Sequence, residues 1–233
     1  MHKIDIPERV HKGVVARRGR ANPFDSLAGS ATALLVVDLQ NAFMLPGMVV
    51  EIPAAREIVP NVNRIAKAVR RFGGKVVWLK MTLDGEAEKW TVYFNHFTHP
   101  DHRLDEVRSM TRGDIGHDLY SSLDVKPDDL IVEKRRFSPF IQGASNLDET
   151  LKNLGIDSVI VTGAVTNVCC EATARDAMML NYKTVFVSDA NAARNDEDHN
   201  ASLSAIWRVF AAIHSTEEVL ALLAAGQEQI INR

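Results

Sequence analysis

Three residues that are far apart in this chain have the types needed for nucleophilic hydrolysis. Cys169 is a candidate nucleophile, Asp38 a candidate acceptor for its thiol proton, and Lys134 a candidate cation to steady the charges that form. A sulfur that attacks a carbonyl carbon produces an oxyanion, which backbone N–H groups at the start of a helix are suited to hold. These residue types therefore indicate hydrolysis through a covalent intermediate.

Each of the three has a plainer interpretation when it is taken alone. A buried cysteine is most often an inert small hydrophobic residue, an aspartate after a strand often caps a helix, and a single lysine is usually solvated. Their joint placement favours chemistry, because Asp38 and Lys134 each close a predicted strand and Cys169 lies in a predicted strand-to-helix turn. Ligands bind at this carboxyl edge of open α/β sheets. The helix start and the nearby lysine also predict a lowered pKa for the thiol.

The elements that would position these residues alternate between strands and helices. Continuous apolar runs predict five strands, at residues 31–37, 75–80, 129–133, 158–162 and 184–187. Apolar residues at helical spacing and glycine stop signals predict helices at 59–72, 147–154, 168–180, 199–213 and 217–225. This alternation predicts a single-domain α/β fold, in which helices flank a doubly wound parallel sheet in three layers.

Two segments depart from this alternation. Residues 1–30 are rich in charge, glycine and proline without a clear period, so we expect an extended N-terminal arm before a hydrolase domain at 31–233. The long connection at 82–128 carries many aromatic and histidine residues. A connection of this length and composition is typical of a lid or a pocket wall.

The composition argues against several functional classes. The 233 residues carry a formal net charge of −3, and 46% of them are hydrophobic and 24% charged, as in an ordinary globular protein. The basic clusters are too short to bind nucleic acid, and no apolar run is long enough for a membrane span. The N-terminus has no apolar leader segment, so we expect a cytoplasmic protein. The two cysteines, Cys169 and Cys170, are adjacent, which disfavours both a structural disulfide and a thiolate metal cage.

Three segments of the chain resemble the isochorismatase-like cysteine hydrolase superfamily. They read LLVVDLQNAF at 34–43, KRRFSPF at 134–140 and VTGAVTNVCCEATARDA at 161–177. Their order and separations match the family, and the third segment is highly specific. The resemblance covers roughly residues 31–213. Cys170 stands where the family usually has valine, so we interpret it as a packing residue.

The resemblance implies a role for each candidate residue. The family's catalytic aspartate falls on Asp38, its lysine on Lys134 and its nucleophile on Cys169. The resemblance also implies a cis peptide bond between Ala164 and Val165, with the amides of Val165 and Cys169 forming an oxyanion hole. It further implies a parallel sheet flanked by helices and a homodimer or homotetramer.

Comparison within the family narrows the reaction. Cys169 favours hydrolysis of a C–N bond, because members that cleave the vinyl ether of isochorismate commonly lack this cysteine. Metal-dependent nicotinamidases carry an Asp-x-His motif after the second strand, whereas this chain reads LKMTLDG at 79–85, so we expect no metal and no cofactor. The spacing of His96, His99 and His102 makes a helical metal site conceivable. No acidic residue clearly completes such a site, and we interpret the three histidines as polar lid side chains.

The substrate is expected to be a small ureide or amide. The motif TNVC at 166–169, followed by Glu171, is similar to ureidoacrylate and N-carbamoyl amidohydrolases of the family, which suggests a ureido acid, an N-carbamoyl compound, biuret or triuret. The plausible pocket contacts are Asn41, Trp90, Tyr93, Phe137 and Gln142. Plainer roles for these side chains are core packing for the aromatic residues and helix capping for Asn41.

Three other functional classes stay open from the sequence. The chain is also compatible with a nicotinamidase-like or isochorismatase-like hydrolase of another small substrate. A non-catalytic member of the fold is the second alternative, and a thiol redox sensor that uses Cys169 and Cys170 is the third.

Overall fold

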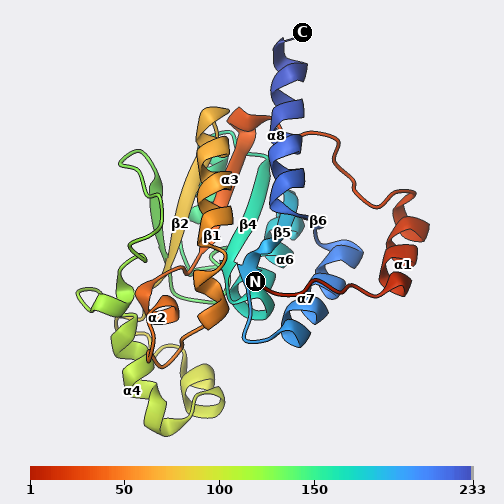
Figure 1. Cartoon of the computed structure of the whole chain (residues 1–233). Coiled ribbons are helices and arrows are strands. Elements are labelled where there is room, and N and C mark those ends of the chain that lie inside the picture. The colour runs from red at the N-terminus through yellow and green to blue at the C-terminus, as the bar shows by residue number, and fades with distance from the viewer. Residues whose placement is uncertain (232–233) are drawn as a thin grey trace.

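A six-stranded parallel sheet forms the centre of the protein in the computed structural model (Figure 1). The structure describes the backbone of residues 1–231 and the side chains through residue 228, so the last two residues of the predicted domain at 31–233 lie outside the described residues. The strands run in the order β3-β2-β1-β4-β5-β6, with the bounds β1 (Thr32–Val37), β2 (Lys75–Met81), β3 (Leu130–Lys134), β4 (Ser158–Ala164), β5 (Lys183–Ala192) and β6 (Ala212–His214).

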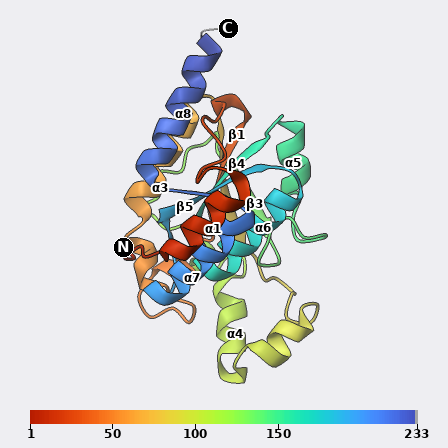
Figure 2. The same ribbon diagram turned by 90° about the vertical axis from the view of Figure 1, so that its right-hand side faces the viewer.

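Helices cover both faces of this sheet. Figure 2 shows α3 (Val59–Arg71) and α8 (Thr216–Ile231) on one side, with α5 (Leu147–Asn153) and α6 (Glu171–Met179) on the other. Every residue of β1 and β4 is buried, which explains why both read as continuous apolar runs and not as alternating ones. The predicted doubly wound α/β fold with three layers is therefore confirmed.

The helix predicted at 59–72 shows how spacing translates into packing. Its apolar residues recur every three or four positions, and the buried set along α3 is Val59, Val62, Ile65, Ala66 and Val69. This stripe packs against β1 and β2. Gly73 follows the helix with φ +81°, a left-handed conformation that glycine adopts without steric cost, and so ends it.

The helix predicted at 199–213 is wrong at both ends. The structure has α7 at Asp196–Val209 and then β6, which joins the sheet edge beside β5. The helix begins early because the side chain of Asn195 accepts a hydrogen bond from the backbone N–H of Asp198, which caps its first turn. After this helix, Ala212–His214 pair with β5 as a short edge strand, in which the first and last residues are buried.

The N-terminal arm is not extended along its whole length. It contains α1 (Glu8–Arg18), which packs on α7 through the buried side chains of Val10 and Val14. Only this one pair of buried residues, four positions apart, carries the helical period, so the pattern is too weak to read from the sequence.

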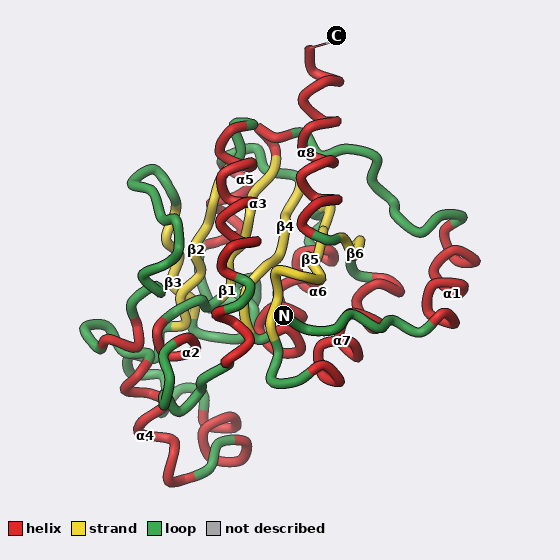
Figure 3. Tube along the Cα trace, viewed as in Figure 1, coloured by secondary structure: helices red, strands yellow, loops and turns green. Residues whose placement is uncertain are grey.

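The part of the connection at 82–128 that contains α4 (Pro100–Ser109) projects beyond the carboxyl ends of the strands, and the following loop runs back beside the sheet to the start of β3 (Figure 3). The connection also contains a wide helical turn at Tyr93–Phe97 and a short turn at Ile115–His117, and it lies beside α2 (Asn41–Met44). We call residues 82–128 the lid. None of the helices in the part of the chain that the structure describes has the length and apolar character needed to cross a membrane.

Candidate active site

The carboxyl ends of β1 and β4 form the floor of the candidate site. These strands are neighbours at the point where the strand order reverses, and Val37 lies opposite Gly163 in their register. Gly163 has φ +118°, and a Cβ atom there would lie 2.1 Å from the carbonyl oxygen of Val37. Only glycine permits this approach, which brings Asp38 after β1 close to the turn that carries Cys169 after β4.

The sheet brings the three predicted catalytic residues together. Lys134 Nζ lies 2.8 Å from Asp38 Oδ2, and both side chains have no solvent exposure. Lys134 also donates a hydrogen bond of 3.2 Å to the carbonyl oxygen of Arg136. The thiol of Cys169 interacts with both the carboxylate and the ammonium. The contact between Asp38 and Lys134 is a buried ion pair, and the thiol of Cys169 lies within hydrogen-bonding reach of the same carboxylate.

The pKa of the Cys169 thiol is raised, contrary to the prediction of a lowered pKa. Burial raises the pKa of Cys169 to about 12; the Lys134 ammonium opposes this rise, while the Asp38 carboxylate adds to it. The expected effect of the ammonium is present, but complete removal from water outweighs it. A nucleophilic role for Cys169 would therefore require a base that takes the thiol proton.

Asp38 is suited to be that base. Burial raises the pKa of its carboxyl group, and the Lys134 ammonium partly opposes the rise. Burial works against the Lys134 ammonium, but Asp38 and Cys169 together raise the pKa of Lys134, so the lysine stays charged. A carboxylate with a raised pKa takes a proton from a thiol more readily than an ordinary aspartate does.

The loops after the strands are held by specific contacts. Asp38 adopts φ +51°, and its backbone N–H donates to the carbonyl oxygen of Leu79 on β2. The buried side chain of Gln40 donates to the carbonyl oxygens of Met81 and His117 and accepts from the Met81 N–H. These bonds tie the loop after β1 to the end of β2 and to the lid.

The peptide bond between Ala164 and Val165 is cis, as the family resemblance implies. A wide helical turn at Thr166–Cys170 follows it and leads directly into α6. Both Val165 and Cys169 line the cavity described next, and the oxyanion role of their amides stays a prediction.

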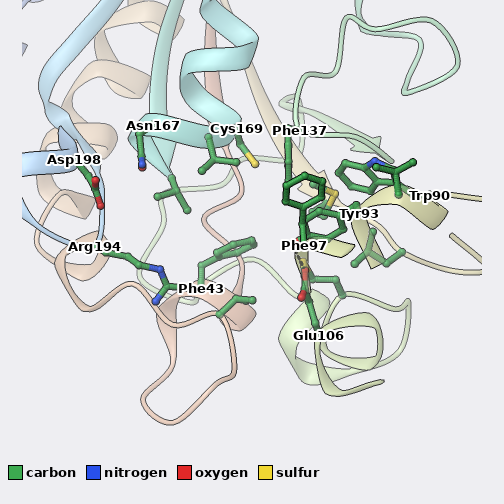
Figure 4. Close-up of a pocket in the computed structure, with 17 residues that line it drawn as sticks. Phe43, Trp90, Tyr93, Phe97, Glu106, Phe137, Asn167, Cys169, Arg194 and Asp198 are labelled. Carbon is green, nitrogen blue, oxygen red and sulfur yellow. Dashed lines mark hydrogen bonds between the residues drawn. The ribbon is translucent and has the colours of Figure 1, made fainter. Parts of the chain in front are cut away.

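A cavity of about 550 Å³ opens above Cys169 (Figure 4). Three of the predicted contact residues, Trp90, Tyr93 and Phe137, line it and form one aromatic cluster. The rings of Trp90 and Tyr93 stack with centroids 4.5 Å apart, and Phe137 meets both rings edge-on. The lid therefore supplies a pocket wall, as the sequence predicted.

The other two predicted contacts do not line this cavity. The side chain of Asn41 turns away and donates a 2.9 Å hydrogen bond to the carbonyl oxygen of Ile115, so it braces α2 against the lid. Gln142 is exposed on the loop after β3. The prediction that Asn41 and Gln142 contact a substrate in this cavity is therefore wrong, because the hydrogen bond to Ile115 directs Asn41 away and Gln142 lies in an exposed loop.

The cavity is also lined by polar residues that are not among the predicted contact residues. Figure 4 shows Arg194 and Asp198 on one side and Glu106 on the other, with Cys169 between them. Arg194 comes two residues after β5, so the same strand-end rule, applied to the fifth strand, would have found it. Glu106 lies within the lid, and no pattern in the sequence marks it.

The lid histidines do not gather into a metal site. His96, His99 and His102 are exposed, and His99 accepts a hydrogen bond from the backbone N–H of Asp101 at the start of α4. Among residues 1–228, no group of three or more histidine, cysteine or acidic side chains is arranged to hold a metal ion. Cys170 is fully buried within the hydrophobic core, which agrees with its interpretation as a packing residue.

The fold and the site together define a doubly wound α/β protein with a buried cysteine, aspartate and lysine where the strand order reverses. The isochorismatase domain family matches residues 32–218 of the chain, so this protein is a hydrolase of the isochorismatase family. The resemblance stated from the three sequence segments is thereby confirmed.

Curated relatives include proteins with amidohydrolase names. A ureidoacrylate amidohydrolase RutB of Variovorax paradoxus is 33% identical over 178 residues, which cover 71% of this chain and 70% of the relative. A probable inactive nicotinamidase of Arabidopsis thaliana is 32% identical over 174 residues, which cover 74% of this chain and 86% of the relative.

Solved structures share the fold. A cysteine hydrolase from Pseudomonas syringae pv. phaseolicola has a TM-score of 0.74 and 28% identity, and the match covers 89% of this chain and all of that one. An N-carbamoylsarcosine amidase from Thermoplasma acidophilum has a TM-score of 0.62 and 28% identity, with 80% of this chain and 96% of that one covered.

Proposed function

We propose that this protein is a cysteine-dependent amidohydrolase that cleaves a C–N bond of a small ureide or amide through a covalent thioester or thiocarbamate. The observation that carries the proposal is the buried ion pair of Asp38 and Lys134 against Cys169 on the floor of a cavity large enough for a small substrate. The names of the RutB relative and the N-carbamoylsarcosine amidase support C–N hydrolysis in this family.

In the first half-reaction, the sulfur of Cys169 attacks the carbonyl carbon while its proton passes to Asp38. Lys134 keeps Asp38 ionised beforehand and offsets the negative charge that develops. The amides of Val165 and Cys169 hold the oxyanion. As the oxyanion collapses, the C–N bond breaks and the proton on Asp38 passes to the leaving nitrogen, which departs as ammonia or an amine.

In the second half-reaction, water replaces the departed amine. Asp38, again a carboxylate, takes a proton from the water as its oxygen attacks the bound carbonyl carbon. The C–S bond then breaks, and the proton returns to the sulfur of Cys169. The product is a carboxylic acid from an amide or a carbamic acid from a ureide, and the enzyme returns to its protonated-thiol resting state.

The charge distribution of the cavity favours a ureido acid among the candidate substrates. Arg194 lines the cavity, and within the described part of the chain its guanidinium forms no ion pair or hydrogen bond. Asn167, which is exposed and has no hydrogen-bond partner among the residues that the structure describes, lies on the same side (Figure 4). A substrate carboxylate would receive a charge-assisted hydrogen bond from Arg194, which neutral biuret and triuret cannot use.

The partners, the location and the assembly of the enzyme are also part of the proposal. We infer a small-molecule substrate without nucleic-acid or membrane partners, a cytoplasmic location and a homodimer or homotetramer, as the composition and the family resemblance imply. Light scattering coupled to size-exclusion chromatography distinguishes these two assemblies, and a monomer would contradict both.

The test is ammonia release by the purified protein from ureido acids, biuret, triuret, nicotinamide and simple amides. We expect release from a ureido acid and its loss in Cys169→Ala, together with a mass increase of wild-type protein that corresponds to the carbamoyl or acyl group. Cys170→Val is the matched control, because that cysteine only packs in the core, and it should retain activity.

Two outcomes would change the assignment. Release of ammonia by Cys169→Ala at the wild-type rate would contradict the mechanism. Turnover of nicotinamide alone would move the substrate to the nicotinamidase-like alternative, which the name of the Arabidopsis relative brings into consideration.

A further inference from the structure

Two carboxyl groups, those of Asp198 and Glu106, line the cavity without taking part in the proposed reaction. Asp198 lies beside Arg194 (Figure 4) and accepts a hydrogen bond from the side chain of Asn195, so Glu106 is the acidic group of the lid side. Glu106 lies on α4 of the lid and is only 8% exposed, whereas its neighbours Leu104 and Asp105 are exposed. It belongs to the lining of the cavity, on the side opposite Arg194 (Figure 4). The lid helix therefore directs this one acidic side chain inward.

Glu106 has no cationic partner in the described part of the chain. Its Oε1 accepts a 2.6 Å hydrogen bond from the hydroxyl of Tyr93, and its second oxygen accepts none. Glu86, the other buried glutamate of the lid, differs sharply, because it forms ion pairs with Arg135 and Arg136. Glu86 is thus a structural brace, whereas Glu106 retains an unused acceptor in the cavity.

An unpaired carboxylate in apolar surroundings is costly, so its charge favours a cationic ligand. Burial raises the pKa of Glu106, and the hydrogen bond from Tyr93 partly opposes the rise. The walls beside it are aromatic, including Tyr93, Phe97 and Phe137. Aromatic rings attract ammonium groups through their π faces, which adds to the attraction of the carboxylate.

We propose that Glu106 is a specificity-determining residue whose free carboxylate oxygen binds an ammonium group at the end of the substrate that enters the lid side of the cavity. The placement of the scissile group at Cys169 rests on the proposed function. With Arg194 on the opposite side, the cavity suits an amino-acid-like ureide or amide that carries a carboxylate at one end and an ammonium at the other.

The first experiment does not depend on catalysis. Calorimetry measures the binding of n-hexylammonium and of 1-hexanol, two probes of similar length of which only the first is charged, to wild-type protein. We expect the ammonium to bind about tenfold more tightly, as one charged hydrogen bond in an apolar site would produce. Equal affinities, or tighter binding of the alcohol, would overturn the proposal.

Three variants locate the effect. Glu106→Gln keeps the size and the contact with Tyr93 but removes the charge, so the preference for the ammonium should disappear. Asp105→Asn removes a carboxylate from the exposed face of the same helix and should leave the preference unchanged. Tyr93→Phe leaves the charge of Glu106 in place, so this variant should keep most of the preference for the ammonium. A preference that survives in Glu106→Gln would refute the role of this residue, and thermal melts establish that each variant is folded.

The second experiment connects the residue to turnover. The substrates are Nα-carbamoyl-lysine and Nα-carbamoyl-2-aminoheptanoate, in which a methyl group replaces the ammonium. We expect kcat/KM to favour the lysine derivative about tenfold in wild type and to be equal for both in Glu106→Gln. Turnover of both substrates without discrimination would contradict the Glu106 proposal while leaving the cysteine mechanism intact. Absence of turnover together with selective binding of hexylammonium would contradict the proposed function alone.

Discussion

The floor of the cavity and its lid differ in how the fold positions their side chains. Asp38, Lys134 and Cys169 come from strand ends, are almost fully buried and hold one another in fixed positions. The lid is a long connection between β2 and β3, and it contributes apolar side chains, several of them aromatic, and one carboxyl group to the cavity. In the proposed function the floor supplies the groups for bond breaking, whereas the lid and the loop after β5 supply the groups that distinguish one substrate from another.

From this difference we expect substitutions on the floor to affect the chemical step and substitutions at the rim to affect substrate recognition. Strand ends are positioned by the register of the whole sheet, so a change there acts on the reacting atoms. Arg194 follows β5 in a loop and Glu106 lies on a lid helix, so under the proposal they contact only the parts of a substrate that are remote from the reacting atoms. Variants on the floor should therefore lower kcat, and variants around the rim should raise KM.

The largest effect is expected from the two charged residues of the floor. Asp38→Asn and Lys134→Met should each lower kcat by about a thousandfold or more, because the base is lost in the first and its counter-charge in the second. Their effects on the thiol should be opposite. The Asp38 carboxylate raises the pKa of Cys169 and Lys134 lowers it, so Asp38→Asn should speed alkylation of Cys169 by iodoacetamide at pH 8 and Lys134→Met should slow it.

Mass spectrometry of the labelled protein measures these alkylation rates, and circular dichroism controls for folding. The control matters because each variant leaves one buried charge unpaired, which costs about 3–5 kcal/mol. If both variants shift the alkylation rate in the same direction, the two residues do not exert opposing fields on the thiol.

An intermediate effect is expected at the rim. Arg194→Gln should raise KM for a ureido acid by about 10- to 100-fold with little change in kcat, because a charge-assisted hydrogen bond to the substrate carboxylate is lost. The KM of Arg194→Gln for biuret, which lacks a carboxylate, should equal that of the wild type in steady-state kinetics. Arg208→Gln removes a similar charge from the exposed face of α7 and is the matched control. If Arg194→Gln lowered kcat as much as Asp38→Asn does, the proposed division between a catalytic floor and a recognition rim would be wrong.

The smallest effect is expected at the N-terminus. His2 accepts a 2.9 Å hydrogen bond from the backbone N–H of Ala193 through Nε2, which leaves Nδ1 to donate to Asp196. Since these contacts hold the loop that carries Arg194, His2→Ala should raise KM for a ureido acid by about threefold and leave kcat unchanged.

Steady-state kinetics of His2→Ala beside His11→Ala provide the comparison. His11 lies on α1 against Trp207 and does not touch this loop, so its variant should behave like wild type. Identical KM values for the two variants would show that the N-terminal segment does not position the rim.

The sequence predicted the floor well and the rim only in part. Asp38 and Lys134 could be placed because an apolar run ending in a polar residue marks the carboxyl end of a strand, and all such ends meet at one edge of a parallel sheet. Trp90 and Tyr93 were recognised by the aromatic content of a long connection. The prediction fails for Asn41 and Gln142 because residue type alone does not determine the direction of a side chain.

By itself, the sequence determined the alternation of strands and helices, the residue types at the strand ends and, through three motifs, the family. The burial that raises the pKa of the Cys169 thiol and the position of Glu106 in the cavity lining follow only from the tertiary structure. The reason is that strand identity depends on local hydrophobic pattern, whereas removal from water and side-chain direction depend on how distant segments pack over the site.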